Sequence, residues 1–193
     1  MLANFKKAYL EKVTFEDAHL PHANFFLASI KNVSFGDANL FMSDFDEAKC
    51  KDVYFRRANL TKAELNEATF NKVSFELANL NRAEFNSSVL NSVKFRNAKL
   101  IYTEFHSTSL KDVDFSYATI KSPQSDSLHF YTVQGVGTSG EILYIPEIDS
   151  IFWGTVIGSL EQFEKDILKI YPKGKQEYTA LINYFKALPV YKK

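Results

Sequence analysis

The chain has 193 residues, a length that suits one large domain or two small ones. Its 23 Lys and Arg residues equal its 23 Asp and Glu residues, so the formal net charge is zero and direct binding to nucleic acid is not expected. Cys50 is the only cysteine, so no internal disulfide can form. The chain opens without a signal-like segment, and its apolar runs are too short for a membrane span. We therefore expect a soluble cytoplasmic protein without membrane contacts.

An apolar residue occupies every fifth position from Phe5 to Ile120, which makes 24 centres in an unbroken series. A small or β-branched residue stands two positions before each centre, and the remaining positions are mostly polar. A spacing of five fits neither the helical period of 3.6 nor the strand period of 2, and therefore indicates a repeat. Three extended residues followed by a two-residue corner would wind the chain into a coil.

A longer period of 20 residues sets the number of sides. Valine recurs two positions before the centre at Val13, Val33, Val53, Val73, Val93 and Val113, and phenylalanine follows two residues after each of them. Residue n therefore lies above residue n−20, with four pentapeptides in each turn. The sequence predicts a mainly β fold over residues 1–120: a four-sided parallel β-helix of six coils, with Cys50 as a buried and inert core residue.

The motif Ala-(Asn/Asp)-Leu-X-X appears, for example, at residues 38–40, 58–60 and 78–80. This motif resembles the pentapeptide-repeat proteins, and the resemblance covers 120 of the 193 residues. It implies a right-handed quadrilateral β-helix and a non-enzymatic role in binding a protein partner. The best-understood members of the family bind bacterial type II topoisomerases such as DNA gyrase, and are similar in outline to a short DNA duplex.

One surface column carries stacked carboxylates at Asp44, Glu64, Glu84 and Glu104. A strip of this kind could bind a basic partner; the alternative is a solvated column balanced by Lys49, Lys62 and Arg82. Residues 1–120 carry 15 basic and 15 acidic residues, so the bulk charge differs from that of a DNA mimic.

Apolar side chains are also expected on adjacent corners of the second and third coils. Phe26, Leu27, Phe41 and Met42 stand at these corners, and we expect one contiguous patch that contacts a partner or a second copy. The first coil of the repeat leaves its backbone N–H and C=O groups unpaired, and a second copy of the chain could cover them, which favours a homodimer.

The composition changes after residue 120. Residues 121–127 are predicted to form a linker, because Ser and Pro follow the last apolar centre. Residues 128–134, 141–145 and 150–157 then predict three strands, and apolar stripes over 160–170 and 178–188 predict two helices, the first capped by Ser159 and Gln162. Residues 128–193 should thus form a small α+β module, a β-meander plus two helices. It resembles a domain that follows pentapeptide repeats in some bacterial and phage proteins.

No chemistry-bearing motif has its required context. Residues 135–140 spell Gly-x-Gly-x-x-Gly, but a predicted strand follows where dinucleotide binding needs a helix, so we expect a hairpin loop. His19 and His22 lack further ligands for a metal. We expect no enzyme activity, no cofactor and no metal. The main hypothesis is a scaffold that binds a protein through the β-helix faces; in the alternative, the β-helix is a stalk and residues 128–193 recognise a protein or small ligand.

Overall fold

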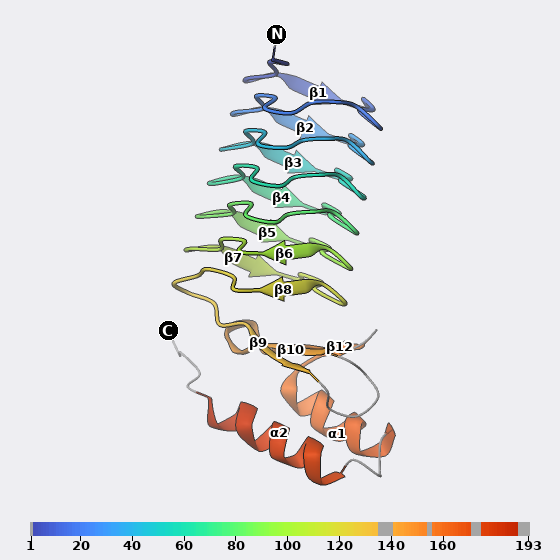
Figure 1. The fold of residues 1–193 in the computed structure, drawn as a ribbon, viewed down its shortest axis with the longest axis vertical. Helices are drawn as coiled ribbons and strands as arrows, with labels where there is room; N and C mark the ends of the chain where they lie inside the picture. Colours follow the sequence, from blue (N-terminus) through green and yellow to red (C-terminus); the bar gives the residue numbers. More distant parts are fainter. Residues whose placement is uncertain (1, 135–140, 154–155, 171–174, 189–193) are drawn as a thin grey trace. The chain divides into compact units, whose positions relative to one another are not determined.

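The computed structural model describes residues 2–134, 141–153, 156–170 and 175–188 (Figure 1). The chain divides into two compact units, with the boundary between Ser127 and Leu128. The glycine-rich stretch 135–140, expected to be a hairpin loop, lies outside the described residues.

The first unit is a stack of coils in which every strand pairs in parallel with a strand 20 positions away in the sequence (Figure 1). One side holds a six-stranded sheet of β1 (Tyr9–Glu11), β2 (Ser29–Lys31), β3 (Lys49–Lys51), β4 (Thr69–Asn71), β5 (Val89–Asn91) and β7 (Ser109–Lys111). A second side pairs β6 (Lys99–Ile101) with β8 (Thr119–Lys121). This side continues toward the N-terminus through single bridges such as His19↔Asn39. Bridges such as Asn4↔Asn24 and Thr14↔Ser34 form the other two sides. The predicted four-sided parallel β-helix is confirmed; coil one is residues 1–20, coil two 21–40, and so on.

Every corner uses a left-handed residue. The second residue after each centre has a positive φ, from 47° at Ser122 to 61° at Leu77, and none of these residues is glycine. The left-handed region costs an L-residue about 1–2 kcal/mol. Hydrogen bonds within the corners offset this cost, as where the backbone N–H of Ala8 donates to the carbonyl of Phe5 at 2.9 Å.

Stacked aromatic rings fill the interior. The column from Phe15 to Phe115 is unbroken, with successive ring centroids 4.9 to 5.2 Å apart. The column that starts at Phe5 is interrupted in coil four by Leu65, and in that coil Phe70 occupies a position that is aliphatic or cysteine elsewhere. Cys50 is buried, as predicted, and burial raises the pKa of its thiol to about 12.

The backbone ladder extends beyond the last apolar centre. Lys121 pairs with Ile101, and Gln124 bridges Glu104 and accepts a hydrogen bond at 2.7 Å from the N–H of Phe105. Residues 121–124, expected to begin a linker, therefore start a seventh coil. The polar residue Ser125 stands where a centre would fall, so the apolar pattern ends one coil before the backbone pairing does.

The second unit is an antiparallel sheet with two helices. Its strands are β9 (Tyr131–Gln134), β10 (Glu141–Ile145), β11 (Ser150–Trp153) and β12 (Val156–Gly158), in the order β12-β11-β10-β9, and the 3-10 helix η1 (Pro146–Ile148) joins β10 to β11. The single strand predicted over 150–157 is instead two strands, β11 and β12, which pair antiparallel with Trp153 opposite Val156.

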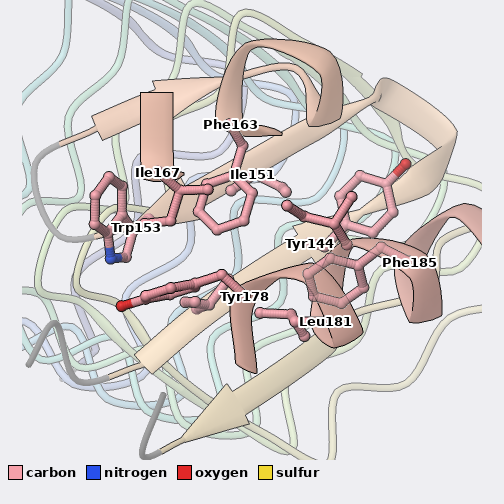
Figure 2. Close-up of a cluster of buried hydrophobic side chains, with 10 residues drawn as sticks. Tyr144, Ile151, Trp153, Phe163, Ile167, Tyr178, Leu181 and Phe185 are labelled. Carbon is pink, nitrogen blue, oxygen red and sulfur yellow. The ribbon is translucent and has the colours of Figure 1, made fainter. Parts of the chain in front are cut away.

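The helices are α1 (Leu160–Ile170) and α2 (Lys175–Ala187). As predicted, Ser159 caps α1: its hydroxyl accepts the N–H of Gln162 at 3.1 Å. Phe163 and Ile167 from α1, and Tyr178 and Phe185 from α2, pack with Trp153 in the core of this unit (Figure 2). No helix in the described ranges has the length and apolar character needed to cross a membrane.

Candidate protein-binding face

One side of the β-helix gathers acidic side chains over coils three to six. We call residues 41–47, 61–67, 81–87 and 101–107 the acidic face; each segment runs from one corner, across the strand, to the next corner. Asp44, Glu64, Glu84 and Glu104 form its central column, and parallel bridges join each of them to the next. The predicted stacking of these four carboxylates follows from the 20-residue register, which places one of them on each coil.

Charge is concentrated on this face although the β-helix as a whole is neutral. It holds seven acidic residues and two basic residues, Lys62 and Arg82, which leaves a net charge of −5 with His106 neutral. The acidic residues are Asp44, Asp46, Glu47, Glu64, Glu67, Glu84 and Glu104. The counts of 15 basic and 15 acidic residues over residues 1–120 conceal this segregation.

A second column, which contains Asn66 and Asn86, holds two of the four central carboxylates in place. The side-chain amide of Asn66 donates to Glu84 at 3.3 Å, and that of Asn86 donates to Glu104 at 3.0 Å. The side-chain oxygens of the same two asparagines accept the backbone N–H groups of Asn86 and His106 in the following coils. Each asparagine thus links two coils and fixes a carboxylate in the coil that follows its own. Sequence reasoning missed this column, although the spacing of Asn66 and Asn86 by 20 residues signals it.

The carboxylates repel one another. Burial, followed by the charges of Asp46, Asp44 and Glu84, raises the pKa of Glu64. Burial is also the largest cause of the raised pKa of Asp46, which the backbone N–H of Asn66 partly opposes. Among the described residues, no Lys, Arg or His nitrogen lies within 4.0 Å of the four central carboxylates.

A groove runs beside the acidic column. One wall is the corner column Met42, Lys62, Arg82 and Tyr102, and the other is Glu64, Glu84, Glu104 and Gln124. The Arg82 guanidinium lies 5.8 Å from the centre of the Tyr102 ring, a cation–π contact. Lys62 and Arg82 therefore stand beside the carboxylates, as the alternative interpretation expected, without forming ion pairs to them.

Family models identify the repeat. The model described as "Pentapeptide repeats (8 copies)" matches residues 3–40, and the model described as "Pentapeptide repeat region" matches residues 48–124. The chain belongs to the pentapeptide-repeat family. A search of curated proteins finds no match.

Several solved structures resemble the pentapeptide-repeat unit. Rfr23, a pentapeptide repeat protein from the cyanobacterium Cyanothece 51142, is 19% identical over 64% of this chain and 84% of its own, with a TM-score of 0.33. QnrB1, a plasmid-mediated fluoroquinolone resistance protein, is 16% identical over 64% and 67%, with a TM-score of 0.42. HetL from Nostoc sp. strain PCC 7120 is 14% identical over 63% and 86%, with a TM-score of 0.22.

The four apolar residues predicted as one patch lie at the two edges of this side of the pentapeptide-repeat unit. Phe26 and Leu27 follow the strand of coil two, whereas Phe41 and Met42 precede the strand of coil three, so the column of Asn24 and Asp44 runs between the pairs. Phe26 lies under the ammonium of Lys6 at 4.8 Å, and the ring of Phe41 meets that of His22 edge-on at 5.8 Å. The register therefore yields two small apolar pairs at separate corners.

Possible metal ligands on the pentapeptide-repeat unit are few. His19 lies 3.4 Å from the Asn39 amide, and His22 packs on Phe41. In the part of the chain that the structure describes, one group of three ligand atoms comes within 4.8 Å of one another, from Asp44, Asp46 and Glu64. These side chains are partly solvated and belong to the acidic face already described.

Proposed function

We propose that this pentapeptide-repeat protein is a non-enzymatic scaffold that binds a basic protein partner through its acidic face. The observation that carries the proposal is the net charge of −5 on one side of a neutral β-helix, formed by carboxylates that have no ion-pair partner among the described residues. Electrostatic complementarity of this kind attracts a partner and sets its orientation.

The opposite side of the β-helix provides the contrast. There, charges stacked one coil apart are paired: Lys31 with Glu11 at 2.8 Å, and the Nε of Arg57 with Asp37 at 2.6 Å. The acidic face has the same 20-residue spacing but like charges at the stacked positions. Burial, followed by these neighbouring carboxylates, raises the pKa of Glu64, and burial with a smaller contribution from Asp44 raises that of Asp46. A local departure from the charge pairing used elsewhere is typical of a functional surface.

Site-specific crosslinking in the native lysate tests the proposal with the full chain. A photoreactive phenylalanine analogue would replace Tyr102, 49% exposed on the acidic face, or Tyr54, 53% exposed on the opposite face. We expect a discrete crosslinked protein from position 102 and none from position 54. The same product from both positions would contradict the proposal.

Charge reversal supplies the second arm. Glu64→Lys with Glu84→Lys should abolish the crosslink from position 102. The matched control is Asp52→Lys with Asp112→Lys, which changes the net charge equally in a corner column that already contains Lys12 and Lys72. Loss of the crosslink in both double variants would show that total charge, and not the acidic face, governs binding.

Type II topoisomerases are one candidate partner, because protein surfaces that bind DNA are basic and the acidic face carries the opposite, complementary charge. Family resemblance supplies this candidate, and the zero net charge of the chain weakens it. A gyrase supercoiling assay, with and without a quinolone, tests this candidate. We expect the protein to inhibit gyrase or to protect it from the quinolone. The absence of both effects would reject gyrase as the partner.

Two further candidates have their own tests. The β12 edge of the second unit exposes Val156 at 39% and Ile157 at 44%, which favours the alternative that this unit carries recognition. If Val156→Lys with Ile157→Lys removes the crosslinked partner and the Glu64 and Glu84 variants do not, the alternative is supported. The expected homodimer is tested by light scattering at micromolar concentration, where a clean monomer contradicts it.

A further inference from the structure

The groove beside the acidic column repeats along the axis of the β-helix. Each wall receives one side chain from each coil, so any partner that contacts several coils must repeat at the spacing of the coils. Stacked rings measure that spacing directly: Phe75 and Phe95 lie 5.2 Å apart, and Phe55 and Phe75 lie 4.9 Å apart.

This spacing matches an α-helix better than a strand. A helix rises about 5.4 Å per turn, whereas side chains on one face of a strand repeat about every 6.7 Å. From Glu64 to Glu104 the groove advances two coils, about 10 Å at the strand spacing of a sheet. Two helical turns cover about 10.8 Å, and two strand repeats cover about 13.4 Å. A helix laid along the axis therefore keeps register with three successive carboxylates, and a strand does not.

The two walls also define the charges that such a helix would carry. Residues at i, i+4 and i+7 share one stripe of a helix, so Lys or Arg at these positions would face Glu64, Glu84 and Glu104. Asn66 and Asn86 each bind one oxygen of a carboxylate, which orients the group while its other oxygen remains free to accept. Lys62 and Arg82 on the facing wall disfavour a uniformly basic helix and select acidic or polar residues on the adjacent stripe.

Resting on the proposed function, we propose that the occupant of the groove is an α-helix of the partner protein, aligned with the axis of the β-helix. It carries a basic stripe toward Glu64, Glu84 and Glu104 and an acidic or polar stripe toward Lys62 and Arg82. Met42 and Tyr102, 43% and 49% exposed at the two ends of the wall, would contact apolar residues of this helix.

Synthetic peptides test the inference on the full-length protein by fluorescence anisotropy. The matched probe is a stapled 16-residue helix with Lys at i, i+4, i+7 and i+11 and Glu on the adjacent stripe. One control is a stapled helix with the same residues permuted so that no stripe forms, and another has the same charge with two internal prolines. We expect the matched helix to bind at least about tenfold more tightly than either control, a difference of about 1.4 kcal/mol.

A variant locates the binding. Glu84→Gln should weaken the matched helix by about tenfold, because it removes the central carboxylate. Asp112→Asn, which makes the same charge change at another corner, should leave binding unchanged. Equal binding of the proline control would overturn the helical occupant, and equal binding to the Glu84→Gln variant would overturn the groove as its site. Neither result affects the crosslink at position 102, on which the proposed function depends.

Discussion

Coil four exchanges two core residues relative to its neighbours, and this exchange predicts a strong energetic coupling. Leu65 stands where coils three and five have Phe45 and Phe85, and Phe70 stands where they have Cys50 and Leu90. Leu65 and Phe70 are fully buried. The ring of Phe70 meets Phe75 at 5.6 Å and Phe85 at 5.8 Å, both edge-on. We infer that it fills the space that the smaller Leu65 leaves.

Each single substitution should destabilise the β-helix. Phe70→Leu leaves a cavity and removes two ring contacts, at a cost of about 1–2 kcal/mol. Leu65→Phe adds volume to a filled interior, at a cost of about 1–3 kcal/mol. The double variant restores the arrangement of coils three and five, so we expect it to cost below about 1 kcal/mol. The coupling between the two sites is then about 2 kcal/mol, within the range of residues that share one packing space.

Urea unfolding followed by far-UV circular dichroism measures these free energies. The only tryptophan, Trp153, lies in the second unit, so its fluorescence reports on that unit and serves as an internal control. Leu65→Phe with Phe115→Leu is the control pair; Phe115 lies more than two coils away, so its effect should be additive with that of Leu65→Phe. Additivity of Leu65→Phe and Phe70→Leu within about 0.5 kcal/mol would refute the proposed exchange of volume.

Three further predictions concern single residues. Leu77→Gly should raise the free energy of unfolding by about 1 kcal/mol, because Leu77 has a φ of 61° that glycine adopts without strain; an unchanged urea midpoint would contradict this. Burial raises the pKa of the Cys50 thiol to about 12. A thiol-specific reagent at mildly alkaline pH should therefore react with Cys50 only after the protein unfolds. Fast labelling of the folded protein would contradict the burial of this residue. The raised pKa of Glu64 means that this residue binds a proton more readily in the folded state than in the unfolded chain. The free-energy cost of keeping Glu64 ionised in the folded state is therefore relieved as the pH falls from neutral through that pKa. Over this pH range, thermal unfolding at matched pH values should show the wild type gaining stability relative to Glu64→Gln.

The backbone of the β-helix is predictable from the sequence because five-residue and 20-residue periods constrain every position at once. The apolar pattern nevertheless ends at Ile120, whereas the backbone ladder continues to Gln124, because main-chain pairing needs no apolar side chain. In the second unit, β-propensity over 150–157 located extended residues but not their division into β11 and β12, which depends on the antiparallel pairing of these two strands.

The candidate site is predictable only in part. Stacking of Asp44, Glu64, Glu84 and Glu104 follows from the register alone. Whether Lys62 and Arg82 pair with these carboxylates depends on side-chain conformations, which periodicity does not determine. The support from Asn66 and Asn86 likewise requires side chains that reach across coils, as at the 3.0 Å contact from Asn86 to Glu104.

The unvarying offset of 20 residues in the backbone ladder makes the positions of surface groups a matter of counting. Bridges from Asn4↔Asn24 to Glu104↔Gln124 all keep this offset. Excision of one complete turn would rejoin equivalent corners and leave every column aligned. Excision of a single pentapeptide between coils two and three would instead carry Glu64, Glu84 and Glu104 a quarter-turn round the axis relative to the first two coils. Insertions and deletions in such a chain therefore act as rotations of its surface.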